Sequence, residues 1–319
     1  MALVGISALL ASAFMTRKVM AKARAAGMTG QDMHKADKPD VPEMGGIAIA
    51  AGFIGAVLLG LVLNTVLHLQ LGVMEMIAAL LTVCIVAIIG ILDDMFDMRQ
   101  LTKTLLPLAA SVPLVVVALA AGQNSISIPF IGAIDFGIAY PLLLIPLAVA
   151  VCSNLTNMLA GYNGLEAGMG AIMFATLSVV ALVHGQAEMT ILSLAMLGAL
   201  LGFLPFNWFP AKVFIGDVGT FSIGAALAAS VIISDLKSAG AILVIPFVVD
   251  FFLKAANRFP KSFAEIGPNN RLYAPKGKVR GLADLVLLVA DGLSEKALVM
   301  RLLAIEAVFA LIVLALYVK

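Results

Sequence analysis

The chain contains few charged residues. Asp, Glu, Lys and Arg make up 12% of its 319 residues, whereas a typical soluble domain has about 25%. Hydrophobic residues make up 62% of the chain. This composition excludes an ordinary soluble globular domain and indicates an integral membrane protein.

Cysteine is also scarce. Cys84 and Cys152 each lie in an apolar run, so no disulfide framework and no cysteine metal cluster is expected. Both side chains are interpreted as small buried hydrophobic groups.

Long apolar runs predict about ten transmembrane helices, since one crossing needs about 20 residues. They cover residues 2–14, 47–67, 74–92, 105–121, 138–151, 171–183, 191–206, 213–233, 239–252 and 298–318. The first run leads into Arg17 and Lys18 without a cleavage site, which favours a retained helix over a signal peptide. The expected fold is one all-α membrane domain over residues 1–319.

The basic residues predict the orientation of the chain. Eighteen of the twenty Lys and Arg residues lie in segments that fall on one side when ten helices are threaded alternately. By the positive-inside rule that side is cytoplasmic and both termini lie outside. Residues 124–136, with polar and apolar alternation followed by Pro and Gly, predict a small exterior hairpin.

An acidic cluster follows the third apolar run. Asp93, Asp94 and Asp97 precede Arg99 and Lys103. Carboxylates at the edge of hydrocarbon are costly, and such groups commonly bind an ion, relay a proton or contact a substrate. The alternative is a short solvated loop that happens to be acidic.

Three other segments carry polar groups at expected helix ends. Pro42 to Gly46 re-enters the membrane at a Gly-Gly pair, which allows close backbone approach, but this segment taken alone favours an ordinary helix-starting loop. Asn154 and Asn157 share a helix face and could hold a hard cation or a nucleotide; the alternative is helix capping and hydrogen bonding between helices. Asp217 lies between two glycines, where it could hold a metal-bridged phosphate or cap a helix.

The largest hydrophilic segment, residues 254–297, is expected to be a basic cytoplasmic loop. Its apolar residues Leu282, Leu285, Val286, Val289 and Leu293 recur at helical spacing and predict an amphipathic helix on the membrane surface. Its cations could grip a pyrophosphate or serve only as orientation signals. Asp250, just before the loop, is either an intramembrane acid or a helix-terminal residue.

Taken together, these segments resemble the polyprenyl-phosphate N-acetylhexosamine-1-phosphate transferases. The resemblance rests on four motifs in the family's order: Pro42-Glu43-x-Gly45-Gly46, Asp93-Asp94-x-x-Asp97 with Lys103, residues 154–166 from Asn154 to Glu166, and residues 206–217 from Phe206 to Asp217. Residues 157–168 are similar to the branch that acts on dolichyl phosphate. The last loop lacks the histidines of bacterial relatives and the insertion of eukaryotic members, which favours an archaeal-type enzyme.

The resemblance implies transfer of N-acetylglucosamine-1-phosphate, or a related amino sugar phosphate, from a UDP-sugar to dolichyl or polyprenyl phosphate, with release of UMP. This would be the first step of lipid-linked glycan assembly. It further implies a Mg²⁺ cofactor, with Mn²⁺ as an alternative, held by Asn157 and Asp217. Asp93, Asp94 and Lys103 would be catalytic. Substrate would be bound by Met33, Glu43, Asn154, Gly161, Asn163, Phe214, Arg271, Lys276, Lys278 and Arg280.

Two other functions remain open from the sequence. One is a bacterial-type transferase acting on undecaprenyl phosphate. The other is a nucleotide-sugar or ion transporter, although a transporter would place its polar sites near the membrane midplane. Expected partners are the membrane and the two substrates, with no nucleic acid, and a homodimer is a further expectation. The active site is expected to face the cytoplasm from the cell membrane, or from the endoplasmic reticulum membrane in a eukaryote.

Overall fold

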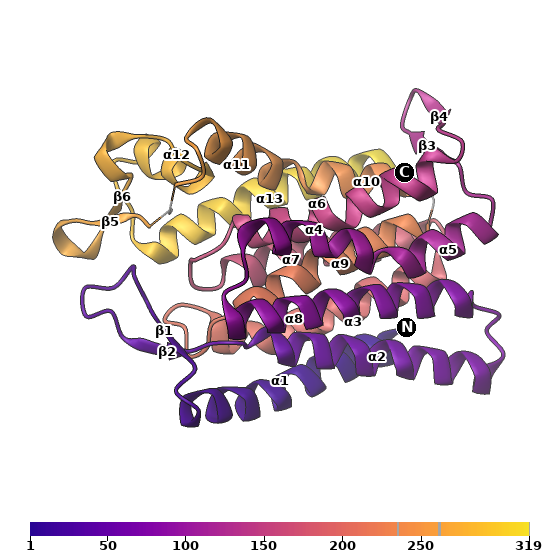
Figure 1. Ribbon diagram of the computed structural model, residues 1–319, viewed down its shortest axis with the longest axis horizontal. Helices are drawn as coiled ribbons and strands as arrows, with labels where there is room; N and C mark the ends of the chain where they lie inside the picture. Colours follow the sequence, from indigo (N-terminus) through magenta and orange to yellow (C-terminus); the bar gives the residue numbers. More distant parts are fainter. Residues whose placement is uncertain (235, 261–262, 319) are drawn as a thin grey trace.

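The computed structural model describes residues 1–234, 236–260 and 263–318, and it is predominantly helical (Figure 1). The helices are α1 (Ala2–Ala25), α2 (Gly46–Leu67), α3 (Val73–Phe96), α4 (Gln100–Ala110), α5 (Val112–Ala120), α6 (Ile145–Met158), α7 (Leu165–Val183), α8 (Ala187–Asn207), α9 (Gly216–Ile232), α10 (Lys237–Leu243), α11 (Ile245–Ala256), α12 (Leu282–Val289) and α13 (Glu295–Tyr317). A π-helical turn, Tyr140–Leu144, leads into α6. Short 3-10 turns occur at Pro268–Asn270 and Pro275–Gly277.

Three two-stranded antiparallel sheets lie in the connections. They pair β1 (Thr29–Gln31) with β2 (Asp40–Pro42), β3 (Ser125–Ile128) with β4 (Gly132–Asp135), and β5 (Glu265–Ile266) with β6 (Leu272–Tyr273). In the β3–β4 hairpin Ser125 pairs with Asp135 and Ile128 with Gly132. The hairpin expected from residues 124–136 is therefore confirmed as an element.

Every predicted apolar run overlaps a helix or helix pair, but the helices fall short of ten full spans. In the described part of the chain, eight helices are long and apolar enough to cross a membrane, and nine if the bent pair α10–α11 counts as one span. The remaining run forms α9, which has 17 residues. A chain with so many apolar helices is an integral membrane protein.

Proline interrupts several of these helices. Pro107 in α4 and Pro113 near the start of α5 flank a break at Ser111 between the two helices. Helix α11 begins at Ile245, has Pro246 as its second residue, and is bent by 50° relative to α10. Proline lacks the N–H that an interior helical position donates, so the chain bends where the hydrogen-bond ladder is interrupted.

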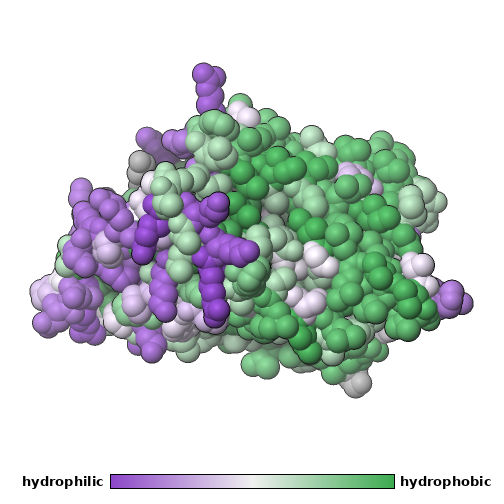
Figure 2. Space-filling view, turned by 90° about the horizontal axis from the view of Figure 1, so that it is seen from below, coloured by the Kyte–Doolittle hydropathy of each residue, from purple (hydrophilic) through white to green (hydrophobic). Residues whose placement is uncertain are grey.

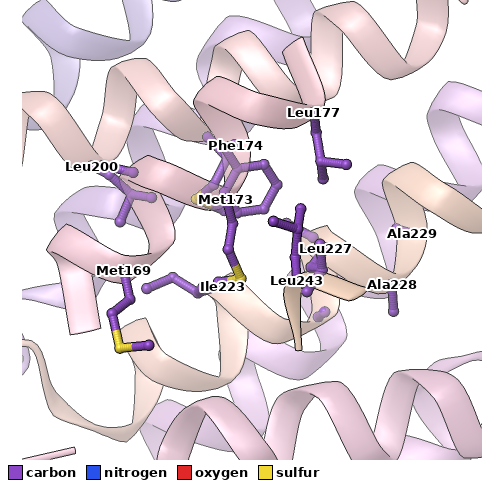
Figure 3. Close-up of a cluster of buried hydrophobic side chains, with 14 of the residues drawn as sticks. Met169, Met173, Phe174, Leu177, Leu200, Ile223, Leu227, Ala228, Ala229 and Leu243 are labelled. Atoms are coloured by element: carbon purple, nitrogen blue, oxygen red, sulfur yellow. The ribbon is translucent and has the colours of Figure 1, made fainter. Parts of the chain in front are cut away.

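The middle of the bundle is packed from apolar side chains and small residues. Figure 3 shows Met173 and Phe174 of α7 close to Ile223 and Leu227 of α9. At Gly224 a Cβ atom would lie 2.3 Å from the Cys152 carbonyl oxygen, so α9 approaches α6 closely only because this residue is glycine. Such small-residue contacts are the usual way in which membrane helices pack.

Polar residues gather at one end of the molecule. Figure 1 places β1–β2, β5–β6 and α12 at one end of the bundle, with β3–β4 at the other, and both termini lie toward the β3–β4 end. The space-filling view shows the same division, with hydrophilic residues concentrated at the first end and a broad hydrophobic surface over the rest (Figure 2). Cys84 and Cys152 are free and half-buried, so they are less buried than the sequence predicts.

Candidate active site

The acidic cluster meets the Gly-Asp segment at the polar end. Lys103, near the start of α4, places its Nζ 2.9 Å from Oδ2 of Asp93 and 3.6 Å from Oδ2 of Asp217. The Asp93 side chain is 1% exposed, whereas that of Asp217 is 29% exposed. One ammonium therefore bridges a buried carboxylate and an accessible one, and the accessible one can reach a ligand.

Asp94 anchors the start of α9. Its Oδ1 accepts a hydrogen bond from the backbone N–H of Asp217 at 2.7 Å, and its Oδ2 accepts one from the N–H of Val218 at 3.1 Å. A carboxylate is favourable there because the first N–H groups of a helix have no partner within it. Gly216 has φ +68°, and an added Cβ would lie 2.7 Å from Asp94 Oδ2, so this turn requires glycine.

The Gly-Gly pair brings the segment before α2 against the same turn. Gly45 and Gly46 donate backbone hydrogen bonds to the carbonyl oxygens of Phe214 and Ile215 at 2.8 and 2.7 Å. A Cβ on Gly46 would lie 2.2 Å from the nitrogen of Gly219. The Gly-Gly pair therefore does more than start a helix: it makes the close backbone approach that glycine allows, and its partner is the turn that carries Asp217.

A polar cavity of about 280 Å³ lies beside these contacts. We use this name for the space lined by Gln31, Asp32, Met33, Glu43, Asn157, Ala160, Gly161, Tyr162, Glu166, Asn207, Phe214, Ile215, Gly216, Asp217, Thr220 and Phe263. It combines the segment before α2, the loop after α6 and the turn into α9. Burial raises the pKa of the Glu43 carboxyl. Of the predicted site residues, Met33, Glu43, Asn157, Gly161, Phe214 and Asp217 line this cavity.

The two predicted metal ligands are joined through Thr220. Its hydroxyl donates to Oδ1 of Asn157 at 3.2 Å and lies 3.1 Å from the Asp217 carbonyl oxygen. Asn157 and Asp217 both line the polar cavity, and carboxylate and carboxamide oxygens are the donors that hard divalent cations prefer. This donor set therefore fits a divalent ion.

Asn163, predicted to bind substrate, does not line the polar cavity as described. It is buried, its side-chain amide donates to Oδ2 of Asp32 at 3.0 Å, and its backbone N–H donates to Oε1 of Glu295 at 2.8 Å. Lys35 completes the group, with its Nζ bonded to Asp32 and 3.9 Å from Glu295 Oε2. We call Asp32, Lys35, Asn163 and Glu295 the loop cluster. It joins three segments distant in sequence around the polar cavity.

His34 stacks on Tyr162 beside the loop cluster, with ring centroids 4.4 Å apart. Burial lowers the pKa of His34 to about 4. Burial opposes ionisation of Asp32, but its bonds to Lys35 and Asn163 outweigh that effect and lower its pKa. Although Asp32, His34 and Glu295 could offer metal ligands within 4.8 Å of one another, the Lys35 ammonium already supplies positive charge there.

A second, larger space opens from the polar cavity. The apolar groove has a volume of about 1080 Å³ and runs between α4, α6 and α11. Its lining comprises Gln100, Thr104, Leu105, Leu108, Leu147, Ala150, Val151, Asn154, Leu155, Asn157, Met158, Ala160, Gly161, Val248, Phe251, Phe252, Lys254, Phe259, Pro260 and Phe263. Asn157, Ala160, Gly161 and Phe263 line both spaces, so the groove and the cavity meet there.

Asn154 supports the groove wall. Its amide donates to the carbonyl oxygens of Ala150 at 2.8 Å and Thr104 at 3.2 Å, and so ties α6 to α4. Asn154, predicted to bind substrate, thus lines the apolar groove and not the polar cavity as described.

The cations of the basic loop that were predicted to bind substrate line neither the polar cavity nor the apolar groove as described. Arg271, Lys276 and Lys278 are exposed. Arg280 pairs with Asp284 at 2.9 Å and donates to the carbonyl oxygen of Phe263 at 3.1 Å. It thus supports a residue at the meeting point of the two spaces. The predicted amphipathic helix is the short α12, with Leu285 and Val289 exposed.

Sequence reasoning left Asp250 undecided and missed its partner. Asp250 is 1% exposed, pairs with Lys254 at 2.7 Å and accepts the backbone N–H of Leu282 at 2.8 Å. Lys254 also donates to the carbonyl oxygen of Met158. The spacing of four residues on one helix was the only sequence signal for this pair.

Comparison with known proteins decides the family. The glycosyl transferase family 4 profile matches residues 76–235, which include Asp93, Lys103, Asn157 and Asp217. This chain belongs to glycosyl transferase family 4. The family resemblance expected from the four motifs is thereby confirmed.

The relatives of this family 4 chain include proteins from archaea, eukaryotes and bacteria. A Saccharolobus solfataricus protein, provisionally named a UDP-N-acetylglucosamine–dolichyl-phosphate N-acetylglucosaminephosphotransferase, is 40% identical over 92% of this chain and 89% of its own length. The Dictyostelium discoideum protein with that enzyme name is 27% identical over 88% of this chain and 79% of its own. The phospho-N-acetylmuramoyl-pentapeptide-transferase of Limosilactobacillus fermentum is 37% identical over 51% of this chain and 54% of its own.

Proposed function

We propose that this protein transfers N-acetylglucosamine-1-phosphate from UDP-N-acetylglucosamine to dolichyl or a related polyprenyl phosphate, releasing UMP. The observation that carries the proposal is the shared border of the polar cavity and the apolar groove. One space suits a hydrophilic nucleotide sugar and the other an isoprenoid chain. The relatives that align with most of this chain bear the name of this activity.

The reaction requires positioning and charge neutralisation. An oxygen of the lipid phosphate attacks the β-phosphorus of the UDP-sugar, and the bond from that phosphorus to the α–β bridging oxygen breaks. UMP leaves with the electron pair, and a lipid diphosphate carrying the sugar is formed. A phosphate monoester is a competent nucleophile at neutral pH, so the chain need only align two anions and offset their repulsion.

Residues at the border can perform these tasks. Lys103, held between Asp93 and Asp217, places positive charge beside the accessible Asp217 carboxylate. Mg²⁺, bound by Asp217 and Asn157, would neutralise diphosphate charge. Glu43, Met33 and Phe214 line the part of the cavity that would receive the nucleotide sugar.

A single displacement fits the carboxylates better than an aspartyl-phosphate intermediate. Both Asp94 oxygens accept backbone hydrogen bonds. Asp93 accepts a hydrogen bond from the Met98 N–H at 2.9 Å and forms an ion pair with Lys103. These contacts suit positioning. Detection of an acyl-phosphate after incubation with UDP-sugar in the absence of lipid would contradict this mechanism.

The polar end is proposed to face the cytoplasm, with both termini outside, as the positive-inside rule predicts. Soluble UDP-sugar would then enter at the helix ends while the acceptor stays in the bilayer. A transporter is disfavoured because the polar groups gather at helix ends rather than at the midplane of the bundle.

The test is transfer of radiolabel from UDP-N-acetylglucosamine to dolichyl phosphate, with and without Mg²⁺. We expect Mg²⁺-dependent product and UMP from the wild-type chain, and no transfer by Asp217→Ala inserted normally in the membrane. Undecaprenyl phosphate and other UDP-sugars serve as competing substrates to separate the bacterial-type alternative. Flux of UDP-sugar into vesicles without UMP release would overturn the proposal.

A further inference from the structure

The apolar groove contains one feature that an isoprenoid chain does not require. Among the described residues that line it, Lys254 is the only charged one. Its side chain is 11% exposed, and it lies on α11, opposite the wall formed by α6. A buried ammonium in a hydrocarbon-lined space is costly unless it is paired or binds a ligand.

Lys254 is paired but has capacity for a further partner. Its ammonium has three donors. It forms an ion pair with Asp250 Oδ2 at 2.7 Å and donates a hydrogen bond to the carbonyl oxygen of Met158. Asp250 is itself held by the backbone N–H of Leu282. The pair is therefore fixed between α11, the end of α6 and the start of α12, and the Lys254 ammonium keeps donor capacity for a ligand.

The position of Lys254 in the groove indicates the ligand. Met158, which it contacts, directly follows Asn157, where the groove meets the polar cavity. Lys254 does not line the polar cavity as described, so it faces the lipid side of the border. An anionic headgroup on an apolar chain would meet this ammonium as its chain fills the groove.

We propose that Lys254 binds the phosphate of the polyprenyl-phosphate acceptor at the inner end of the apolar groove. The identity of this ligand rests on the proposed function. Lys103 and Lys254 then have separate roles: Lys103 neutralises charge beside Asp217, and Lys254 receives the phosphate of the lipid. The lipid phosphate is thereby held at the border with the nucleotide sugar.

Binding measurements on the full-length purified protein can test this role without turnover. The ligands are a polyprenyl phosphate and the polyprenol of equal length, which differ only in the phosphate. We expect the wild type to prefer the phosphate, and Lys254→Met to weaken phosphate binding by about tenfold or more, as expected when a charged hydrogen bond is lost. Polyprenol affinity should not change, and Lys254→Arg should restore part of the preference.

Two further variants complete the experiment. Lys254→Met leaves Asp250 buried without its counter-ion, so the double variant Asp250→Asn with Lys254→Met is measured as well and should show the same loss of preference. Lys22→Met, the same change at an exposed position of α1, should retain wild-type binding of both ligands.

Retention of the phosphate preference by Lys254→Met and the double variant would overturn the inference. An equal loss of both ligands would overturn it too, since it would show only a damaged groove. Lys254-dependent phosphate binding without any sugar transfer would contradict the proposed function and leave this inference intact. Normal sugar transfer by the wild type, together with an unchanged phosphate preference in Lys254→Met, would support the proposed function and contradict this inference.

Discussion

The polar cavity and the apolar groove share four residues but are built in different ways. Segments far apart in the sequence, from before α2 to the turn into α9, form the cavity. The groove is formed mainly by the sides of α4, α6 and α11. The cavity therefore depends on specific hydrogen bonds and ion pairs between loops, whereas the groove depends on helix packing and on the bend before α11. Substitutions should affect the two spaces separately.

The largest expected effect is on the chemistry at the cavity. Lys103→Met removes the cation between Asp93 and Asp217. It should lower kcat by about 100- to 1,000-fold, because the negative charge of the transition state is then no longer stabilised by the Lys103 ammonium. Binding of polyprenol to the groove should stay at the wild-type level. Lys103→Arg keeps the charge and should retain more activity; equal loss in both variants would show that geometry, not charge, dominates.

The groove can be narrowed without altering the cavity. Val151 lines the groove and is 47% exposed, so Val151→Trp should fit sterically while occupying space meant for the lipid. We expect KM for the lipid acceptor to rise by about tenfold, with KM for UDP-N-acetylglucosamine unchanged. Val179→Trp is the matched control on α7, at 43% exposure, and should behave as wild type. A parallel rise in both KM values would show that the spaces are coupled.

A smaller effect is expected at the loop cluster. Glu295→Ala removes the acceptor of the Asn163 backbone N–H, and an unpaired buried donor costs about 1–3 kcal/mol. The variant should unfold at a lower temperature in detergent and show a several-fold higher KM for UDP-N-acetylglucosamine. The lipid KM should not move. Glu295→Gln keeps an oxygen acceptor and should lose less stability; if it loses as much, the charge opposite Lys35 matters more than the hydrogen bond.

The smallest effect is expected in the basic loop. Lys276 is exposed and lies outside both spaces as described, so Lys276→Met should change kcat and both KM values by less than about twofold. Transfer assays at two ionic strengths provide the measurement. A tenfold rise in KM for UDP-N-acetylglucosamine would instead support pyrophosphate binding by this loop, one of the two roles that the sequence left open.

Local patterns predicted where most helices lie, although not the number of full spans. Each apolar run overlaps a helix or helix pair, and the Gly45-Gly46 pair makes the close backbone approach that its composition allows. The role of Asn163 could not be predicted, because its partners Asp32 and Glu295 are 131 and 132 residues away. Asp250 remained ambiguous for a similar reason, since Leu282, 32 residues further on, is needed to explain its burial.

Hydropathy and short motifs are local properties of the chain. By themselves they determined that this is a helical membrane protein whose polar motifs, at or near the ends of its helices, resemble those of a transferase family. Only the tertiary structure decided which polar groups meet. The Asp94 carboxylate reaches the Asp217 N–H across 123 residues, and Lys254 reaches the Met158 carbonyl across 96. Contacts of this kind depend on the packing of whole helices, and no local spacing encodes them.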